Sequence, residues 1–151
     1  NGRLPFWHHT TLRNIPYLRE IKPYAEIWIH PDDAKKYGIN QEDWVHVESL
    51  RGKVYARAAL TEGIAKGAVY MERFWNPENL DTPTRGWQEM NVNVLSKATA
   101  PFNDVVGTYT LRGFQVKVSK AEGAPKGVWT EAKQFVPWMP QVSDKTKLVE
   151  I

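Results

Sequence analysis

The chain has no cysteine among its 151 residues. This absence excludes disulfide bonds, cysteine-based zinc sites, iron–sulfur ligation and cysteine nucleophiles from this stretch of protein. Long apolar runs are also missing, since none approaches the roughly 20 residues that a membrane-spanning helix needs. The net charge is only +3, and no dense block of Lys or Arg is present. We therefore expect neither membrane insertion nor a nucleic-acid partner.

Several common ligand-binding motifs are absent as well. The sequence contains no Gly-x-Gly-x-x-Gly and no P-loop pattern, and no serine lies in a nucleophile elbow. A Rossmann fold, a P-loop nucleotide site and a serine hydrolase are therefore not indicated. We expect no catalytic residue within the chain.

Length and composition indicate one domain with a substantial core. Apolar residues make up 42% and charged residues 25% of the 151 residues, which is ordinary for a globular domain. The chain begins at Asn1 rather than at Met and shows no signal-peptide pattern, so we interpret it as a fragment or a processed piece. Its seven Trp residues favour an interface or a ligand pocket.

The most regular pattern lies in residues 25–60. Apolar residues at the odd positions from 25 to 29 alternate with other residues, and this period of two indicates a half-buried strand. Pro31 and the two aspartates after it predict the first turn of a short helix, and Gly38 is typical of its end. Alternation resumes after a polar turn. A second strand, a tight reversal at residues 51–52 and a returning strand over 53–60 form a predicted hairpin.

Two asparagines stand out further along, in the segment M-N-V-N-V-L at 90–95. We predict a strand here, because asparagine and valine alternate. The spacing would then place Asn91 and Asn93 on one face, opposite Val92 and Val94. A carboxamide offers one acceptor and two donors, which match the edge of guanine or of a pterin. Because asparagine is depleted in strands, we favour a ligand-binding role. A last strand is predicted within residues 107–118.

The proline-rich first 24 residues are predicted to form an extended segment with a long loop. His8 and His9 could ligate a metal, but a metal site needs three or four convergent ligands, and no suitable partner is spaced nearby. We expect no metal site and favour hydrogen bonding by this pair. Thr10, Thr11 and Arg13 offer donors to phosphate or pterin oxygens. A turn capped by its own threonine side chains explains the threonines equally well.

Residues 25–52 follow the pattern A-E-I-W-I-H-P-D-D-A-x-x-x-G-I-x-x-x-D-W-V-x-V-E-S-x-R-G. This pattern resembles the opening of the C-terminal dinucleotide-binding domain of molybdopterin oxidoreductases, the molybdenum or tungsten enzymes related to dimethyl sulfoxide reductase and formate dehydrogenase. The resemblance implies a mainly β fold with short helices. More specifically, it implies a double-psi β-barrel of the aspartate decarboxylase-like type. Its motifs extend over about residues 3–118.

Further motifs carry the same resemblance. His9 to Arg13 is similar to H-S-E-x-R of the acetylene hydratase-like subgroup, with two threonines in place of Ser-Glu. Residues 74–78 resemble W-W-x-P-E, for which a core anchor followed by a turn is the favoured interpretation. Residues 91–96 resemble N-x-N-x-L-T, with Ser96 keeping the hydroxyl. Residues 107–112 resemble G-T-x-x-L-R, and a hairpin entry with a solvated arginine is the alternative there.

The resemblance implies a cofactor-binding C-terminal domain of an oxidoreductase that uses bis(molybdopterin guanine dinucleotide) with molybdenum or tungsten. The metal ligand and the substrate site would belong to preceding domains of the same polypeptide or to a large catalytic subunit. The isolated domain would have no turnover. The implied cofactor-binding residues are His8, His9, Thr10, Thr11, Arg13, Asn91, Asn93, Ser96, Gly107, Thr108 and Arg112.

Two alternatives accompany this interpretation. One is a free-standing small subunit of such an enzyme, and the other is a non-catalytic double-psi barrel used as a binding module. The barrel is predicted over residues 1–120, with residues 121–151 as an extended tail that packs on the barrel or on a partner domain. We expect a soluble protein, with a prokaryotic cytoplasm or periplasm both open.

Overall fold

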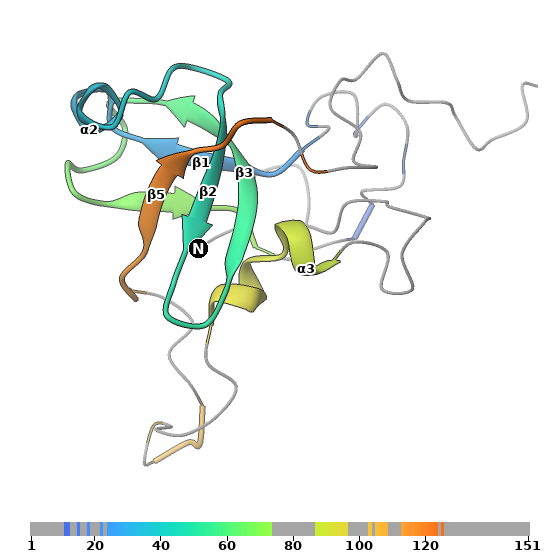
Figure 1. Cartoon of the computed structure of the whole chain (residues 1–151). Coiled ribbons are helices and arrows are strands. Elements are labelled where there is room, and N and C mark those ends of the chain that lie inside the picture. Colours follow the sequence, from blue (N-terminus) through green and yellow to red (C-terminus); the bar gives the residue numbers. More distant parts are fainter. Residues whose placement is uncertain are drawn as a thin grey trace, which may run out of the picture.

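The computed structural model describes residues 11–12, 15, 18, 22, 24–73, 87–96, 103, 105–108, 113–123 and 125. Its elements are, in chain order, β1 (Glu26–Ile29), α2 (Pro31–Lys36), β2 (Trp44–Glu48), β3 (Lys53–Leu60), β4 (Val69–Met71), α3 (Trp87–Met90), the 3₁₀ helix η1 (Val92–Leu95) and β5 (Lys117–Lys120) (Figure 1). The predicted class, mainly β with short helices, is confirmed.

The five strands form one sheet in the order β4-β1-β3-β2-β5. Among the described strands, only β1 and β3 run parallel, and the pairs β1–β4, β2–β3 and β2–β5 are antiparallel. A parallel pair needs a crossover connection, and here α2 and β2 lie on the chain between β1 and β3. The five strands form a curled sheet, as Figure 1 shows.

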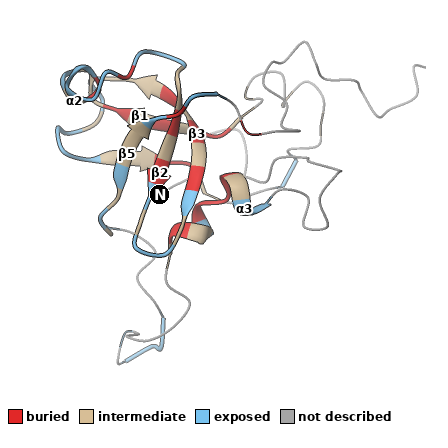
Figure 2. Cartoon of the chain, viewed as in Figure 1, coloured by how far each residue is buried: buried red, intermediate tan, exposed pale blue. Residues whose placement is uncertain are grey.

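The core lies on the concave side of this curled sheet. Burial alternates along β1, β2 and β3, as their period of two predicts (Figure 2). Side chains from α3 and η1, which lie beside the lower end of the hairpin in Figure 1, join the same cluster. The fully buried members with the largest side chains are Ile27, Val45, Val47, Val54, Met90 and Leu95. This arrangement places η1 directly against the core.

Helix α2 is fixed at both ends by the residues that predicted it. Pro31 occupies its first turn, and the Nδ1 atom of His30 accepts a hydrogen bond from the backbone N–H of Asp32 at 3.1 Å. Gly38 adopts a left-handed φ of 64° just after the helix, a conformation that glycine takes without steric cost. The helix is therefore defined by its two caps.

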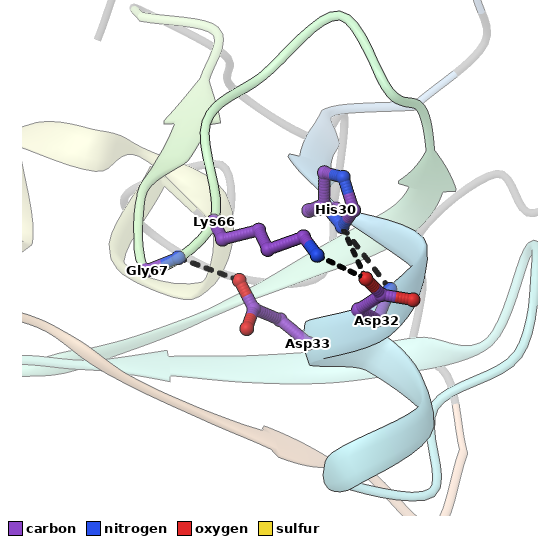
Figure 3. Close-up of polar contacts among 5 residues, drawn as sticks. All are labelled: His30, Asp32, Asp33, Lys66 and Gly67. Carbon is purple, nitrogen blue, oxygen red and sulfur yellow. Dashed lines mark hydrogen bonds and ion pairs between the residues drawn. The ribbon is translucent and has the colours of Figure 1, made fainter.

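The two aspartates of α2 also hold the loop at residues 61–68, which leads into β4 (Figure 3). The Oδ2 atom of Asp32 lies 2.5 Å from Nζ of Lys66. The Oδ2 atom of Asp33 accepts a hydrogen bond from the backbone N–H of Gly67 at 2.6 Å. This Lys66 contact, by hydrogen bond and then by charge, lowers the pKa of Asp32 below its ordinary value. The helix N-terminus thereby sets where β4 begins.

Two predicted strands differ from the structure. Residues 90–95 form the end of α3 and the 3₁₀ helix η1 rather than a strand. The buried residues of η1, Val92 and Leu95, are three positions apart, which fits three residues per turn rather than two. The last strand occupies Lys117–Lys120 and so overlaps the predicted range, 107–118, only at its end. Phe114 and Val116 lie before this strand, and both are half-buried.

We expect Ile27→Ala to lower the free energy of unfolding by about 2–5 kcal/mol, because it leaves a cavity in a close-packed core. Ile27 has no exposed surface. The control is Val105→Ala, because that side chain is 90% exposed and its loss should change stability by less than about 0.5 kcal/mol. Urea unfolding followed by circular dichroism measures both, and equal midpoints would contradict the assigned core.

Lys66→Gln should destabilise the chain only where Asp32 is ionised and Lys66 would be charged. A lowered carboxyl pKa contributes stability above its unfolded value, here 3.8, and that contribution disappears as pH falls through the folded pKa. The pKa of Lys66 is raised by the same contact, so its contribution is lost only as pH rises above the ordinary value of 10.5.

Thermal unfolding from pH 2 to pH 8 tests this sign. The stability difference between wild type and Lys66→Gln should be present at pH 6 to 8 and vanish at pH 2. The matched control is Lys36→Gln on α2, the helix that carries Asp32, because no ion pair of Lys36 is found among the described residues. A difference that persists unchanged at pH 2 would refute the role of the ion pair.

Candidate functional site

The segment 91–96, which carries the two predicted ligand-binding asparagines, is a capped 3₁₀ turn. Asn91 is its N-cap, with an extended backbone, and its Oδ1 atom accepts a hydrogen bond from the backbone N–H of Asn93 at 2.9 Å. Such a cap satisfies a backbone donor that the helix itself leaves unpaired. At the other end, the backbone carbonyl of Asn93 accepts hydrogen bonds from the Ser96 backbone N–H and the Ser96 hydroxyl.

The two asparagines therefore have different surroundings, contrary to the predicted shared strand face. Asn91 is buried, with 9% of its surface exposed, and its carboxamide oxygen is engaged in the cap. The Asn93 side chain is exposed. Val92, predicted to lie opposite both asparagines, is buried as Asn91 is. The geometry thus makes Asn91 a structural cap of η1 and leaves the Asn93 side chain exposed at its surface.

A cavity of about 890 Å³ lies on the concave side of the sheet, next to η1. Val92 and Leu95 line it, together with residues of β1, β4 and β5. The described candidates Asn93, Ser96 and Thr108 are not among the residues that line it. The outward face of η1, rather than this cavity, is therefore the candidate site.

Gly107 and Thr108, two of the predicted cofactor-binding residues, belong to a turn organised by Asn103. The Oδ1 atom of Asn103 accepts hydrogen bonds at 3.0 Å from the backbone N–H groups of Val105 and Val106. Gly107 has a left-handed φ of 68°, and its N–H donates to the Asn103 carbonyl at 2.8 Å. The sequence prediction did not include Asn103, although asparagine is a typical turn residue whose side chain hydrogen-bonds the backbone two residues on.

This turn is exposed and stands apart from η1. The side chains of Val105 and Val106 are 90% and 67% exposed, and Thr108 is exposed as well. Figure 1 draws the turn, in light orange, beyond the lower end of the sheet and separate from α3. The structure does not bring Thr108 and Asn93 together within one pocket of described residues.

Of the first 24 residues, the structure describes residues 11–12, 15, 18, 22 and 24, and Thr11 is the only predicted site residue among these. Thr11 lies in an exposed turn, and Leu12 has a positive φ of 68°. Five predicted site residues lie outside the described residues, namely His8, His9, Thr10, Arg13 and Arg112. Most of the predicted tail, residues 121–151, also lies outside them.

In the described part of the chain, no three His, Asp, Glu or Cys side chains gather in a way that could hold a metal ion. No described helix is long and apolar enough to cross a bilayer.

Residues 1–112 match the sequence model of the family described as "Molydopterin dinucleotide binding domain". This match covers well over half of the chain and includes β1 to η1. The chain therefore belongs to the molybdopterin dinucleotide-binding domain family, whose members form part of molybdopterin oxidoreductases.

Curated relatives agree with this assignment. A dopamine dehydroxylase from Eggerthella lenta is 38% identical over 120 residues, which cover 79% of this chain and 12% of that protein. The catalytic chain of a putative dimethyl sulfoxide reductase from Halobacterium salinarum is 39% identical over 67 residues, which cover 44% of this chain and 8% of the relative. The chain thus spans about an eighth or less of the length of these two relatives.

A solved structure shares the fold. Acetylene hydratase from Pelobacter acetylenicus superimposes with a TM-score of 0.68 at 18% sequence identity. The superposition covers 76% of this chain and 16% of the hydratase chain. At this identity the comparison supports the architecture, whereas the family match supports the molybdopterin cofactor.

The different surroundings of the asparagines predict different effects on stability. Asn91→Ala should lower the free energy of unfolding by about 1 kcal/mol, because it removes the cap of η1. Asn93→Ala should stay within about 0.5 kcal/mol of wild type, since that side chain is exposed. Urea unfolding of the two variants provides the comparison. Equal destabilisation by both substitutions would contradict the separate roles.

Proposed function

We propose that this domain holds the nucleotide end of a bis(molybdopterin guanine dinucleotide) cofactor that carries molybdenum or tungsten. The exposed carboxamide of Asn93 is the observation that carries the proposal. Its acceptor and two donors match the mixed donor and acceptor edge of guanine. Because Asn91 and Ser96 fix the two ends of η1, this carboxamide is presented on a defined backbone.

Ser96 supports the site indirectly in this proposal. Its hydroxyl donates to the Asn93 carbonyl at 2.9 Å, so its hydrogen is already engaged within the turn. Ser96 would therefore keep η1 wound, and Asn93 would contact the base. Gly107 would shape the exposed turn, and Thr108 would present its hydroxyl there, which is suitable for phosphate or pterin oxygens.

The remaining candidates complete the proposed site from the two flanking segments. His8, His9, Thr10, Thr11 and Arg13 would offer donors to pterin and phosphate groups from the N-terminal side. Arg112 would pair with a phosphate from the segment before β5. These roles rest on residue chemistry and on family membership.

The fold that we propose around this site is a double-psi β-barrel. The parallel pairing of β1 with β3, with a strand inserted between them in sequence, supports such interleaved connections. The curled sheet would form about half of the barrel, and residues 121–151 would extend from it as a tail over the barrel or a neighbouring domain.

The proposed domain works with other parts of an enzyme. The chain covers 12% of the dopamine dehydroxylase and 16% of acetylene hydratase, so most of any such catalytic unit lies in other domains or in another chain. When bound, the metal–pterin group supplies the reactive centre. Residues of this domain would bind and orient the nucleotide and keep water from that centre.

Guanosine diphosphate tests the nucleotide half of this proposal. We expect the 151-residue chain to bind it saturably, with chemical-shift changes at the Asn93 side-chain amide in ¹H–¹⁵N spectra. Asn93→Ala should weaken binding about fivefold, the effect of one lost hydrogen bond. Adenosine diphosphate should bind more weakly, because adenine presents a different edge.

Gln115→Ala is the matched control, because Gln115 is also an exposed carboxamide residue. Its affinity for guanosine diphosphate should equal that of wild type. Binding that is the same for wild type and Asn93→Ala, or the same for the two diphosphates, would overturn the guanine assignment.

A further inference from the structure

We propose that the tip of the β2–β3 hairpin positions Asn93 for nucleotide binding, through direct contacts of Gly52 and Ser49 with η1. The inference rests on the proposed function of Asn93 and assigns a positioning role to residues that touch no ligand. Figure 1 shows the hairpin tip beside the coil that follows α3.

Gly52 allows the hairpin to approach η1 more closely than any other residue would. A β-carbon at position 52 would lie 2.6 Å from Cγ1 of Val94 and 3.0 Å from its carbonyl oxygen. The first distance is shorter than real contacts permit, and the second is a tight contact with backbone, so Val94 would have to shift. Gly52 is not among the glycines with positive φ, unlike Gly38. Glycine is therefore needed here for space and not for backbone conformation.

Ser49 adds a polar contact beside this close approach. Its hydroxyl donates a hydrogen bond to the Leu95 carbonyl at 2.9 Å and accepts one from the Arg51 backbone N–H at 3.1 Å. The Ser49 N–H in turn donates to the Gly52 carbonyl at 2.9 Å. The tip thus has its own hydrogen bonds and uses the serine hydroxyl to hold the end of η1.

These contacts reach Asn93 through a very short element. Val94 and Leu95 follow Asn93 directly, and the Val94 N–H donates to the Asn91 carbonyl at 3.0 Å. A displaced Val94 would therefore strain the turn on which Asn93 sits. Leu50 at the tip is fully exposed, so its side chain does not anchor the hairpin. The specific contacts of Gly52 and Ser49 align the two elements.

The first test needs no ligand and measures amide hydrogen exchange in the 151-residue chain. Gly52→Ala should accelerate exchange of the Val94 and Ser96 amides about tenfold or more, whereas the amides of β1 should change little. The matched control is Gly123→Ala, because a β-carbon there meets no atom within 4 Å and Gly123 lacks a positive φ. Its exchange pattern should match that of wild type.

The second test uses guanosine diphosphate and a double-mutant cycle. Gly52→Ala should weaken binding about fivefold, and it should have no further effect when Asn93 is already alanine. Ser49→Ala should weaken binding in the same way, whereas Ser49→Thr keeps the hydroxyl and should restore it. A purely structural role would instead give the same loss with and without Asn93.

The outcomes separate this inference from the proposed function. Unchanged exchange of η1 in Gly52→Ala, or effects that add to that of Asn93→Ala, would overturn the positioning role. If wild type binds no guanosine diphosphate while Gly52→Ala loosens η1, the proposed ligand is wrong and the link from hairpin to η1 stands.

Discussion

The parallel pairing of β1 with β3 is the constraint on which the rest of this structure depends. Its ladder runs from Glu26↔Arg57 to Ile29↔Leu60 and is extended by backbone hydrogen bonds beyond both ends. Because parallel strands cannot be joined by a tight turn, the connection carries α2 and β2 with it. The crossover thus brings the β2–β3 hairpin into the sheet and its tip to the place where η1 lies.

Short capped elements, rather than long helices, hold the candidate site on this sheet. Helix α2 is capped by His30 and holds the loop before β4 by two carboxylates. The η1 turn is capped by Asn91 and rests on the hairpin tip. Such four- to six-residue elements would be unstable alone, so each is maintained by side-chain contacts with the sheet. The position of Asn93 therefore depends on tertiary contacts and not on the local sequence alone.

Much of the sheet could be predicted from the sequence, whereas the asparagine turn could not. The strands within residues 25–60 show a period of two. The helix between the first two strands starts with a proline and is followed by a glycine, so the local signals agree with one another. In 90–95 the same alternation of letters was misleading, because the Asn91 side chain competes for a backbone N–H and winds the chain. Asn93 was identified as a candidate by residue type, but the role of Gly52 depends on a contact between distant segments and has no local signal.

The pairing of β2 with β5 has a consequence for biosynthesis. Glu48 pairs with Lys117, and Val45 with Lys120. The β2 edge of the hairpin therefore stays unpaired during synthesis until β5 has left the ribosome. During that interval β2 presents unpaired backbone groups, which can template pairing with another nascent chain. The exposed Glu48 and Lys53 near this edge are charged residues of the kind that discourages such pairing. Slower synthesis of the segment between these two strands would therefore lengthen the time for which the edge of β2 is open to other chains.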